Sequence, residues 1–204
     1  MNPYSILVGT KNGSLSCFAR TSHNIVCGLS CAHVLAGTDG LFNPQAAPDI
    51  VRIWDEQAQT LVECGQTIAV HRSSPPVVDC GIFQYVAPFV QQFASQLKFL
   101  PLNTAIFHSP KSLIGTELSA FSGPRNLLLR GSVVQVLPNW DFVIRSIDGQ
   151  GFMNGDSGML WLDDEGKAVA MHVAGNGNQQ PSLFSYCTSA YRILQHLDVT
   201  LYSI

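Results

Sequence analysis

The chain has 204 residues, of which 46% are hydrophobic and 12% are charged. This length and apolar content suit one large domain or two small ones and exclude a disordered chain. The formal net charge of −3 gives the chain no electrostatic reason to bind nucleic acid or anionic lipid. No apolar run approaches the ~20 residues that a membrane-spanning helix needs, so the sequence predicts no membrane insertion.

The six cysteines predict buried, reduced thiols rather than a disulfide framework, which stays the alternative. Cys27 and Cys31 have a loose metal-ligand spacing, but no second pair follows, so we expect no metal ion and no cofactor. The segment Met1–Ser5 lacks the character of a secretory signal. Together these features favour a cytoplasmic protein. The cysteines are Cys17, Cys27, Cys31, Cys64, Cys80 and Cys187.

Short apolar runs separated by turn sequences dominate the chain and predict β-strands. Ser14–Ala19 and Ile25–Leu29 flank a polar turn, as do Met159–Leu162 and Ala168–Val173, so each pair is expected to form a hairpin. More than ten short strands without long helices between them indicate an all-β barrel or sandwich. The further candidate strands are Tyr4–Val8, Ile50–Trp54, Thr60–Cys64, Thr67–His71, Val77–Tyr85, Glu117–Phe121, Leu128–Leu137 and Phe142–Arg145.

The strongest local motif is Asn154-Gly155-Asp156-Ser157-Gly158. A serine flanked by glycines lies on backbone with little steric hindrance. Its hydroxyl can therefore be exposed, and nearby amides can converge on a developing oxyanion. The motif indicates a nucleophilic serine at position 157, and a polar β-turn without chemistry is the alternative that it leaves open.

An unassisted serine hydroxyl is a poor nucleophile, so Ser157 needs a base and an orienting acid. His33 follows the apolar run Ile25–Leu29 and is expected at the end of a strand. Asp79 is a lone carboxylate inside the apolar run Val78–Ile82, where an unpaired charge is costly and an imidazole is a natural partner. The alternatives are a core histidine bonded to backbone and a carboxylate that caps backbone amides.

The chain order His33, Asp79, Ser157 resembles that of the chymotrypsin template. The segment Ser30–His33 resembles the Thr-Ala-Ala-His motif of the trypsin-like serine peptidases. Val78–Ile82 resembles the strand that carries their catalytic aspartate.

Two further segments extend this resemblance through the second half of the chain. Gly155–Gly158 is identical to the nucleophile motif of the trypsin-like peptidases, and Ala168–Gly175 resembles the strand that lines their specificity pocket. The match runs from about Gly13 to Gly175. It is closest to the short bacterial and narrow-leaf-type members.

The resemblance implies two six-stranded antiparallel β-barrels with the active site in the cleft between them, followed by a short helix. Helical periodicity in Pro88–Leu97 and in Thr188–Val199 supports a bridge between the barrels and a terminal helix. The expected boundaries are about 1–87 for the first barrel, 88–101 for the bridge, 102–187 for the second barrel and 188–199 for the helix.

The resemblance also implies roles for the motif residues. His33 is the expected general base, Asp79 orients it, and Ser157 attacks the scissile carbonyl to form an acyl-enzyme. The backbone amides of Gly155 and Ser157 are expected to form the oxyanion hole. The chain begins with Met and has no trypsin-type activation motif, so Asp156 needs another partner or stays solvated.

The specificity pocket is expected to contain His172, Val173, Gly175 and Phe152. Gly151 stands where trypsin has its pocket aspartate, which argues against a preference for Lys or Arg. The segment around His172 resembles picornaviral processing proteases and glutamyl endopeptidases, in which this histidine faces the P1 side chain. An imidazole can donate to a carbonyl or carboxylate oxygen, so we expect Glu or Gln at P1. A barrel histidine satisfied by backbone is the alternative.

The sequence therefore predicts a serine endopeptidase that processes a restricted set of protein or peptide substrates, with any regulatory partner unknown. A catalytically silent protease-fold binding module is the second hypothesis. A serine hydrolase that acts on non-peptide esters is the third. It is disfavoured because Ser157 lies late in the chain and Met159 breaks the Gly-x-Ser-x-Gly pattern.

Overall fold

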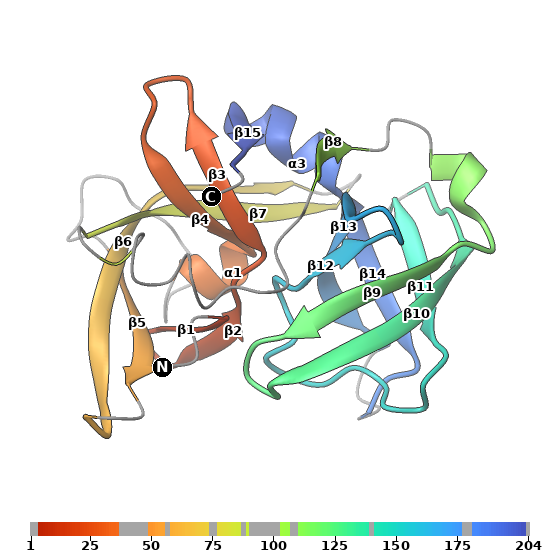
Figure 1. Cartoon of the computed structure of the whole chain (residues 1–204), viewed down its shortest axis with the longest axis horizontal. Coiled ribbons are helices and arrows are strands. Elements are labelled where there is room, and N and C mark those ends of the chain that lie inside the picture. Colours follow the sequence, from red (N-terminus) through yellow and green to blue (C-terminus); the bar gives the residue numbers. More distant parts are fainter. Residues whose placement is uncertain are drawn as a thin grey trace.

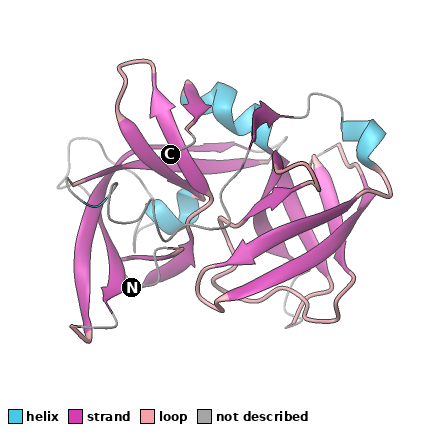
Figure 2. Cartoon of the chain, viewed as in Figure 1, coloured by secondary structure: helices cyan, strands magenta, loops and turns pink. Residues whose placement is uncertain are grey.

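The computed structural model describes residues 4–36, 49–55, 58–73, 77–86, 89, 103–106, 110–138, 141–176 and 181–202. Most of this part of the chain is β-strand, with a few short helices (Figure 2). The strands form two sheets that lie side by side, the N-terminal half of the chain in one and most of the C-terminal half in the other (Figure 1).

The first sheet has eight strands in the order β15-β3-β4-β7-β6-β5-β1-β2. Pairing does not join β15 to β2 in the described part of the chain, so this sheet is a half-barrel. Its strands are β1 (Ser5–Val8), β2 (Lys11–Ser14), β3 (Cys17–Thr21), β4 (Val26–Ser30), β5 (Ile50–Asp55), β6 (Thr60–Ser73), β7 (Val78–Tyr85) and β15 (Val199–Leu201).

The second sheet has the order β12-β9-β10-β11-β14-β13-β8. An additional pairing of β12 with β13 closes six of these strands into a barrel, and β8 adds to its rim in parallel with β13. Its strands are β8 (Asn103–Ile106), β9 (Glu117–Ser122), β10 (Leu127–Gln135), β11 (Phe142–Ser146), β12 (Leu160–Leu162), β13 (Lys167–Gly175) and β14 (Phe184–Ser189).

In the described part of the chain, the sheets are accompanied by the short helices α1 (Ala32–Leu35) and α3 (Ala190–Leu197) and by a 3-10 turn (Pro110–Leu113). Helix α3 buries Ala190, Ile193 and Leu194 and packs against β7 and β13, so it touches both sheets. None of the helices in the described ranges has the length and apolar character to span a bilayer.

The predicted all-β double-barrel architecture with a C-terminal helix is confirmed, with differences in detail. The first sheet is not closed, and β15 adds a strand after the helix that the sequence analysis did not predict. The expected runs Thr60–Cys64 and Thr67–His71 are one long strand, β6. The helix predicted for Pro88–Leu97 lies outside the described residues except at Phe89.

Each sheet has its own apolar core. Phe18, Leu29 and Phe83 are fully or almost fully buried in the first core, and Phe142 and Trp161 in the second. All six cysteines are buried free thiols. The first core also includes Leu160, Ala168, Met171 and Val173 of the second sheet, so apolar packing as well as polar contacts joins the two sheets.

Hydrogen bonds join the two sheets. We call the hydrogen bonds that Ser14 and Ser16 form with the second sheet the inter-sheet seam. The Ser14 amide donates to the Ser157 carbonyl at 2.8 Å, and the Ser14 hydroxyl donates to the Gly155 carbonyl at 3.2 Å. The Ser16 hydroxyl donates to the Gly158 carbonyl. The segment Gly155–Gly158 is therefore held against the first sheet.

The two sheets approach each other closely at Gly123, and a substitution there can test this. A Cβ placed on Gly123 would lie 2.0 Å from the Tyr4 carbonyl oxygen, which is backbone and cannot move aside. We expect Gly123→Ala to destabilise the protein by about 3 kcal/mol, because the overpacking forces the sheets apart. The control Gly115→Ala meets no atom within 4 Å but has a positive φ, and should cost about 1 kcal/mol. Urea unfolding of both variants checks this, and equal losses would contradict it.

Candidate active site

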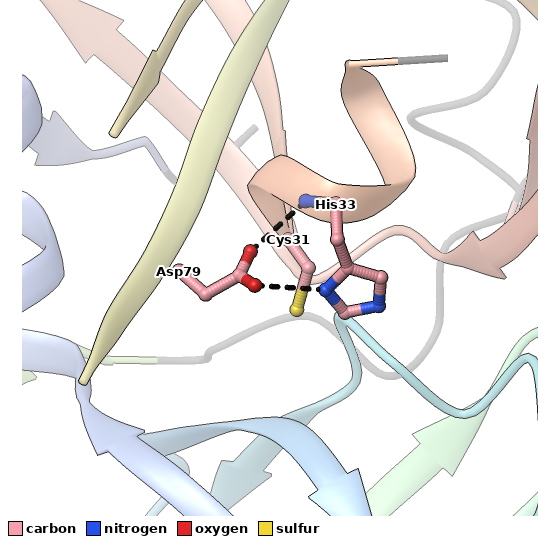
Figure 3. A group of neighbouring side chains, drawn as sticks. All are labelled: Cys31, His33 and Asp79. Atoms are coloured by element: carbon pink, nitrogen blue, oxygen red, sulfur yellow. Dashed lines mark hydrogen bonds and ion pairs between the residues drawn. The ribbon is translucent and has the colours of Figure 1, made fainter. Parts of the chain in front are cut away.

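His33 and Asp79 contact each other directly in the candidate site. His33 lies on α1 directly after β4, and Asp79 lies on β7, which pairs with β4. The His33 amide donates to one carboxylate oxygen of Asp79 at 3.0 Å, and Nδ1 contacts the other oxygen at 3.0 Å. Figure 3 shows both contacts, with the second ring nitrogen pointing away from the carboxylate.

These contacts fix the protonation pattern of His33. An ionised carboxylate can only accept hydrogen bonds, so Nδ1 carries the proton and Nε2 carries a lone pair. Asp79 is buried, and burial alone would raise its pKa. The hydrogen bonds and charge of His33, with the Arg72 guanidinium 3.6 Å away, outweigh this and hold the pKa below its usual value. Asp79 is therefore a carboxylate that holds the backbone and the ring of His33 through two hydrogen bonds.

Ser157 lies in the loop between β11 and β12 and shares a cavity of about 800 Å³ with His33. Its hydroxyl donates to the Val173 carbonyl at 3.2 Å. The structure thus places Ser157 and His33 on one cavity. The hydrogen bond that the Ser157 hydroxyl makes is to Val173 on β13.

The backbone around Ser157 presents two amide groups without a protein acceptor. Gly155 has φ of +95°, a conformation that other residues rarely adopt. Among the described residues, neither the Gly155 amide nor the Ser157 amide donates a hydrogen bond to the protein. Both residues line the cavity, so the amides are available to a ligand oxygen.

Asp156 has a partner that the sequence analysis did not identify. The Asp156 side chain is fully buried and accepts from Arg125 Nη1 at 3.1 Å, from the Met153 amide at 2.8 Å and from the Ser122 hydroxyl. Arg125 lies in the turn between β9 and β10, and it also donates to the Gly151 carbonyl at 2.8 Å. These bonds hold the loop before Ser157 in place, and the need of a buried Asp156 for a cation was the signal that could have found Arg125.

His172, Phe152, Val173 and Gly175 all line the cavity, as the sequence predicts for pocket residues. His172, on β13, is buried, and its ring centroid lies 5.6 Å from that of Phe152. Phe152 packs edge-on against Trp161. His172, Val173 and Gly175 come from β13 of the closed barrel, whereas Phe152 comes from the loop before Ser157.

The imidazole of His172 is tied to buried polar groups that sequence reasoning missed. Nδ1 lies 2.6 Å from the Ser185 hydroxyl on β14, and that hydroxyl accepts from Trp161 Nε1 at 3.3 Å. Burial, with a smaller contribution from the charge of His33, lowers the pKa of His172 to about 3. His172 is therefore neutral at physiological pH.

Cys31, His33 and Asp79 offer ligand atoms within 4.8 Å of one another (Figure 3). Burial raises the pKa of the Cys31 thiol well above its usual value, and the thiol donates to the His172 carbonyl at 3.3 Å. Asp79 is already committed to two hydrogen bonds with His33. A neutral thiol beside a paired carboxylate is a poor metal site, so Cys31 is assigned to the packing beneath His33.

The pair Arg125–Asp156 is expected to stabilise the protein far more than an exposed pair. Removing the cation in Arg125→Leu leaves a buried carboxylate unpaired, which should cost about 3–5 kcal/mol. The control Arg130→Leu removes an equally direct contact with Glu117, but both of those side chains are 60% exposed. That change should cost under about 1 kcal/mol. Similar losses for the two variants in urea unfolding would contradict this assignment.

His172 should make stability fall on mild acidification. Its pKa is about 3 in the fold and about 6.5 in the unfolded chain. The contribution is therefore complete above pH 6.5 and is lost as the pH falls towards 3, because the unfolded chain takes up a proton that the fold does not. Between pH 7 and pH 5 the loss should be about 2 kcal/mol. Urea unfolding should show this loss in the wild type and not in His172→Gln, and an equal loss in both would contradict it.

Comparisons with known proteins agree with this architecture. The chain aligns with a glutamic acid specific serine protease that utilizes a novel histidine triad in substrate binding, with a TM-score of 0.60, 16% identity and 97% of each chain covered. Thermobifida fusca protease A gives a TM-score of 0.61 at 11% identity, over 99% of this chain and 97% of that one. Cellulomonas bogoriensis chymotrypsin gives a TM-score of 0.58 at 14% identity, over 99% of this chain and 97% of that one.

A scan against protein-family models and a search of curated proteins found no match. The likeness to these solved structures therefore rests on the fold. The chain has the double-barrel fold of the chymotrypsin-like serine proteases.

Proposed function

We propose that the protein is a serine endopeptidase in which His33, Asp79 and Ser157 form the catalytic triad. The observation that carries the proposal is the pair of 3.0 Å contacts between His33 and Asp79, because they leave Nε2 of His33 as a base on the cavity that holds Ser157. The chymotrypsin-like fold and the nucleophile motif support the same assignment.

The proposed reaction proceeds through an acyl-enzyme. Ser157 Oγ attacks the scissile carbonyl carbon while its proton passes to Nε2 of His33. The resulting imidazolium is stabilised by the Asp79 carboxylate, and its proton then goes to the leaving amine as the peptide C–N bond breaks. A water molecule releases the acyl group by the same steps, with His33 again acting first as base and then as acid.

The amides of Gly155 and Ser157 are the proposed oxyanion hole. They are free of protein acceptors in the described part of the chain and lie on the loop that the inter-sheet seam and Arg125 hold fixed. Donors that are already in position stabilise the developing negative charge without reorganisation, which is a large contribution to catalysis.

The proposed P1 pocket surrounds His172 and is lined by Phe152, Val173 and Gly175. A buried, neutral imidazole suits a P1 side chain that ends in a carbonyl or carboxylate oxygen, as Gln and Glu do. One structural neighbour is described as glutamic acid specific, which supports this class of side chain. Such a pocket favours a restricted set of protein or peptide substrates.

A second candidate is a binding module that holds a peptide in the cleft without cleaving it. The observation in its favour is the Ser157 hydroxyl, which donates to the Val173 carbonyl at 3.2 Å. In the endopeptidase this contact exchanges for one with His33 when a substrate binds, whereas in a binding module it persists.

Covalent labelling separates the two candidates. A fluorophosphonate should add once to the wild type and not to Ser157→Ala, as measured by intact mass. Peptide turnover should fall by about 10⁴–10⁶ in Ser157→Ala and in His33→Ala. Ser73→Ala, in which the serine lies outside the cavity, is the control and should be labelled like the wild type. A folded wild type that neither labels nor cleaves any peptide would support the binding module instead.

A further inference from the structure

Asp79 has a second charged neighbour besides His33, the guanidinium of Arg72. Arg72 lies on β6 and is the direct cross-strand partner of Asp79 on β7. Its Nε lies 3.6 Å from Oδ2 of Asp79, the same oxygen that accepts from Nδ1 of His33 at 3.0 Å. One carboxylate oxygen therefore faces both the imidazole and a permanent cation.

The Asp79 carboxylate has few partners to compensate its charge. In the described ranges it accepts two hydrogen bonds, both from His33, and Arg72 is the only permanent cation in ion-pair contact with it. The charge of a buried carboxylate is costly unless it is compensated. Arg72 supplies part of this compensation from the surface, because its side chain is 53% exposed whereas that of Asp79 is 8% exposed.

Arg72 reaches Asp79 from a second cavity, which is separate from the one that holds His33 and Ser157. The second cavity has a volume of about 340 Å³, and its lining consists of Arg72, Ser73, Val77, Val78 and Asp79. Among the described residues, the two cavities share none of their lining. Arg72 can therefore act on the site through Asp79 and not by contact with a substrate.

The other buried ionisable groups near the pair are neutral at pH 7. Burial raises the pKa of the Cys31 thiol well above its usual value and raises that of Cys80 to about 12. Burial also lowers the pKa of His172 to about 3. None of these three groups therefore supplies a charge that could replace that of Arg72.

The strands around His33 carry few other charges. Helix α1, which contains His33, packs against β1, β2, β6 and β7. Apart from Arg72 and Asp79, the charged side chains and imidazoles of these strands are Lys11, Glu63 and His71. Lys11 is exposed on β2, Glu63 forms an ion pair with Arg52, and His71 stacks on His196 of α3. Arg72 is thus the cation that acts most directly on Asp79.

We propose that Arg72 is a positioning residue that sets the lower pH limit of the reaction. Its charge offsets part of the charge of Asp79, so the carboxylate attracts a proton on His33 less strongly. His33 therefore stays an unprotonated base at lower pH than it would beside Asp79 alone. This rests on the proposed function, because it requires that His33 acts as the base towards Ser157.

The pH dependence of fluorophosphonate labelling tests the proposal. In Arg72→Gln, the acid limb of the labelling rate should move to higher pH by about 0.5 unit at low salt, because His33 is then protonated more readily. On that limb, labelling should be about threefold slower than in the wild type. Arg72→Lys keeps the charge and should return most of the shift. An acid limb that stays in place or moves to lower pH in Arg72→Gln would overturn the proposal.

A merely structural role of Arg72 gives a different result. Looser packing around Asp79 would lower the labelling rate at every pH without moving the acid limb. Arg52→Gln is the matched control, because it removes an arginine that pairs with a carboxylate of the same sheet and does not line either cavity. Its acid limb should stay at the wild-type position, and a shift equal to that of Arg72→Gln would overturn the assignment.

The wild type provides a test that needs no variant to fold. Salt screens the exposed guanidinium of Arg72 more strongly than the contact of His33 with the buried Asp79. Raising the NaCl concentration from about 0.02 M to about 1 M should therefore move the wild-type acid limb to higher pH by about 0.3 unit. No movement, or movement to lower pH, would overturn the proposal.

Failure of the endopeptidase and failure of this inference give different results. A folded wild type that never reacts with fluorophosphonate contradicts the proposed catalysis. The titration of the His33 ring can still be followed by NMR on the Ser157→Ala background, with and without Arg72→Gln. A titration curve that moves to higher pH in Arg72→Gln supports the role of Arg72, and superimposed curves would overturn it whether or not the protein is an enzyme.

Discussion

The hydrogen bond from the Ser14 amide to the Ser157 carbonyl is the contact on which the site depends. His33 and Asp79 belong to the first sheet, and Ser157 belongs to a loop of the second, so no local interaction brings the three together. The seam does so through the Ser14 amide and the Ser14 and Ser16 hydroxyls, all of which donate to backbone carbonyls of the Ser157 loop. Gly158 adds to it, since a Cβ there would lie 2.3 Å from the Ser14 carbonyl oxygen. The candidate active site is thus a property of how the two sheets meet.

Two buried carboxylates, Asp79 and Asp156, position groups of the candidate site. Asp79 is compensated by His33 within the first sheet, and Asp156 by Arg125 within the second. Each pair therefore forms inside one sheet and sets the position of a group on the shared cavity. A buried charge tolerates few geometries once its partner is in place, so this arrangement gives the loop and the imidazole defined positions. The loop before Ser157 is therefore held in place by Arg125, a residue of the same chain.

The sequence predicted the parts of the molecule that have a local signature. The glycines around Ser157, the apolar run around Asp79 and the hairpin turns are each visible in a short stretch of residues. The number of short strands predicted an all-β barrel or sandwich, and the resemblance to the trypsin-like peptidases implied the double barrel. Strand β14 was missed because Ser185, Thr188 and other polar residues weaken its apolar alternation, although they are buried. Arg125 was missed for a different reason, because its role is set by a partner distant in sequence. The proposed roles of the site residues stay predictions.

Because all six thiols are buried, a reagent in solution does not contact them directly in the folded protein. Burial raises the pKa of Cys17, Cys64, Cys80 and Cys187 to about 12, so the nucleophilic thiolate is scarce as well as shielded. An oxidant or alkylating reagent must wait for a sheet to open before it can react. The resistance of the folded protein to oxidation is therefore set by the free energy of local opening rather than by the redox potential of its surroundings.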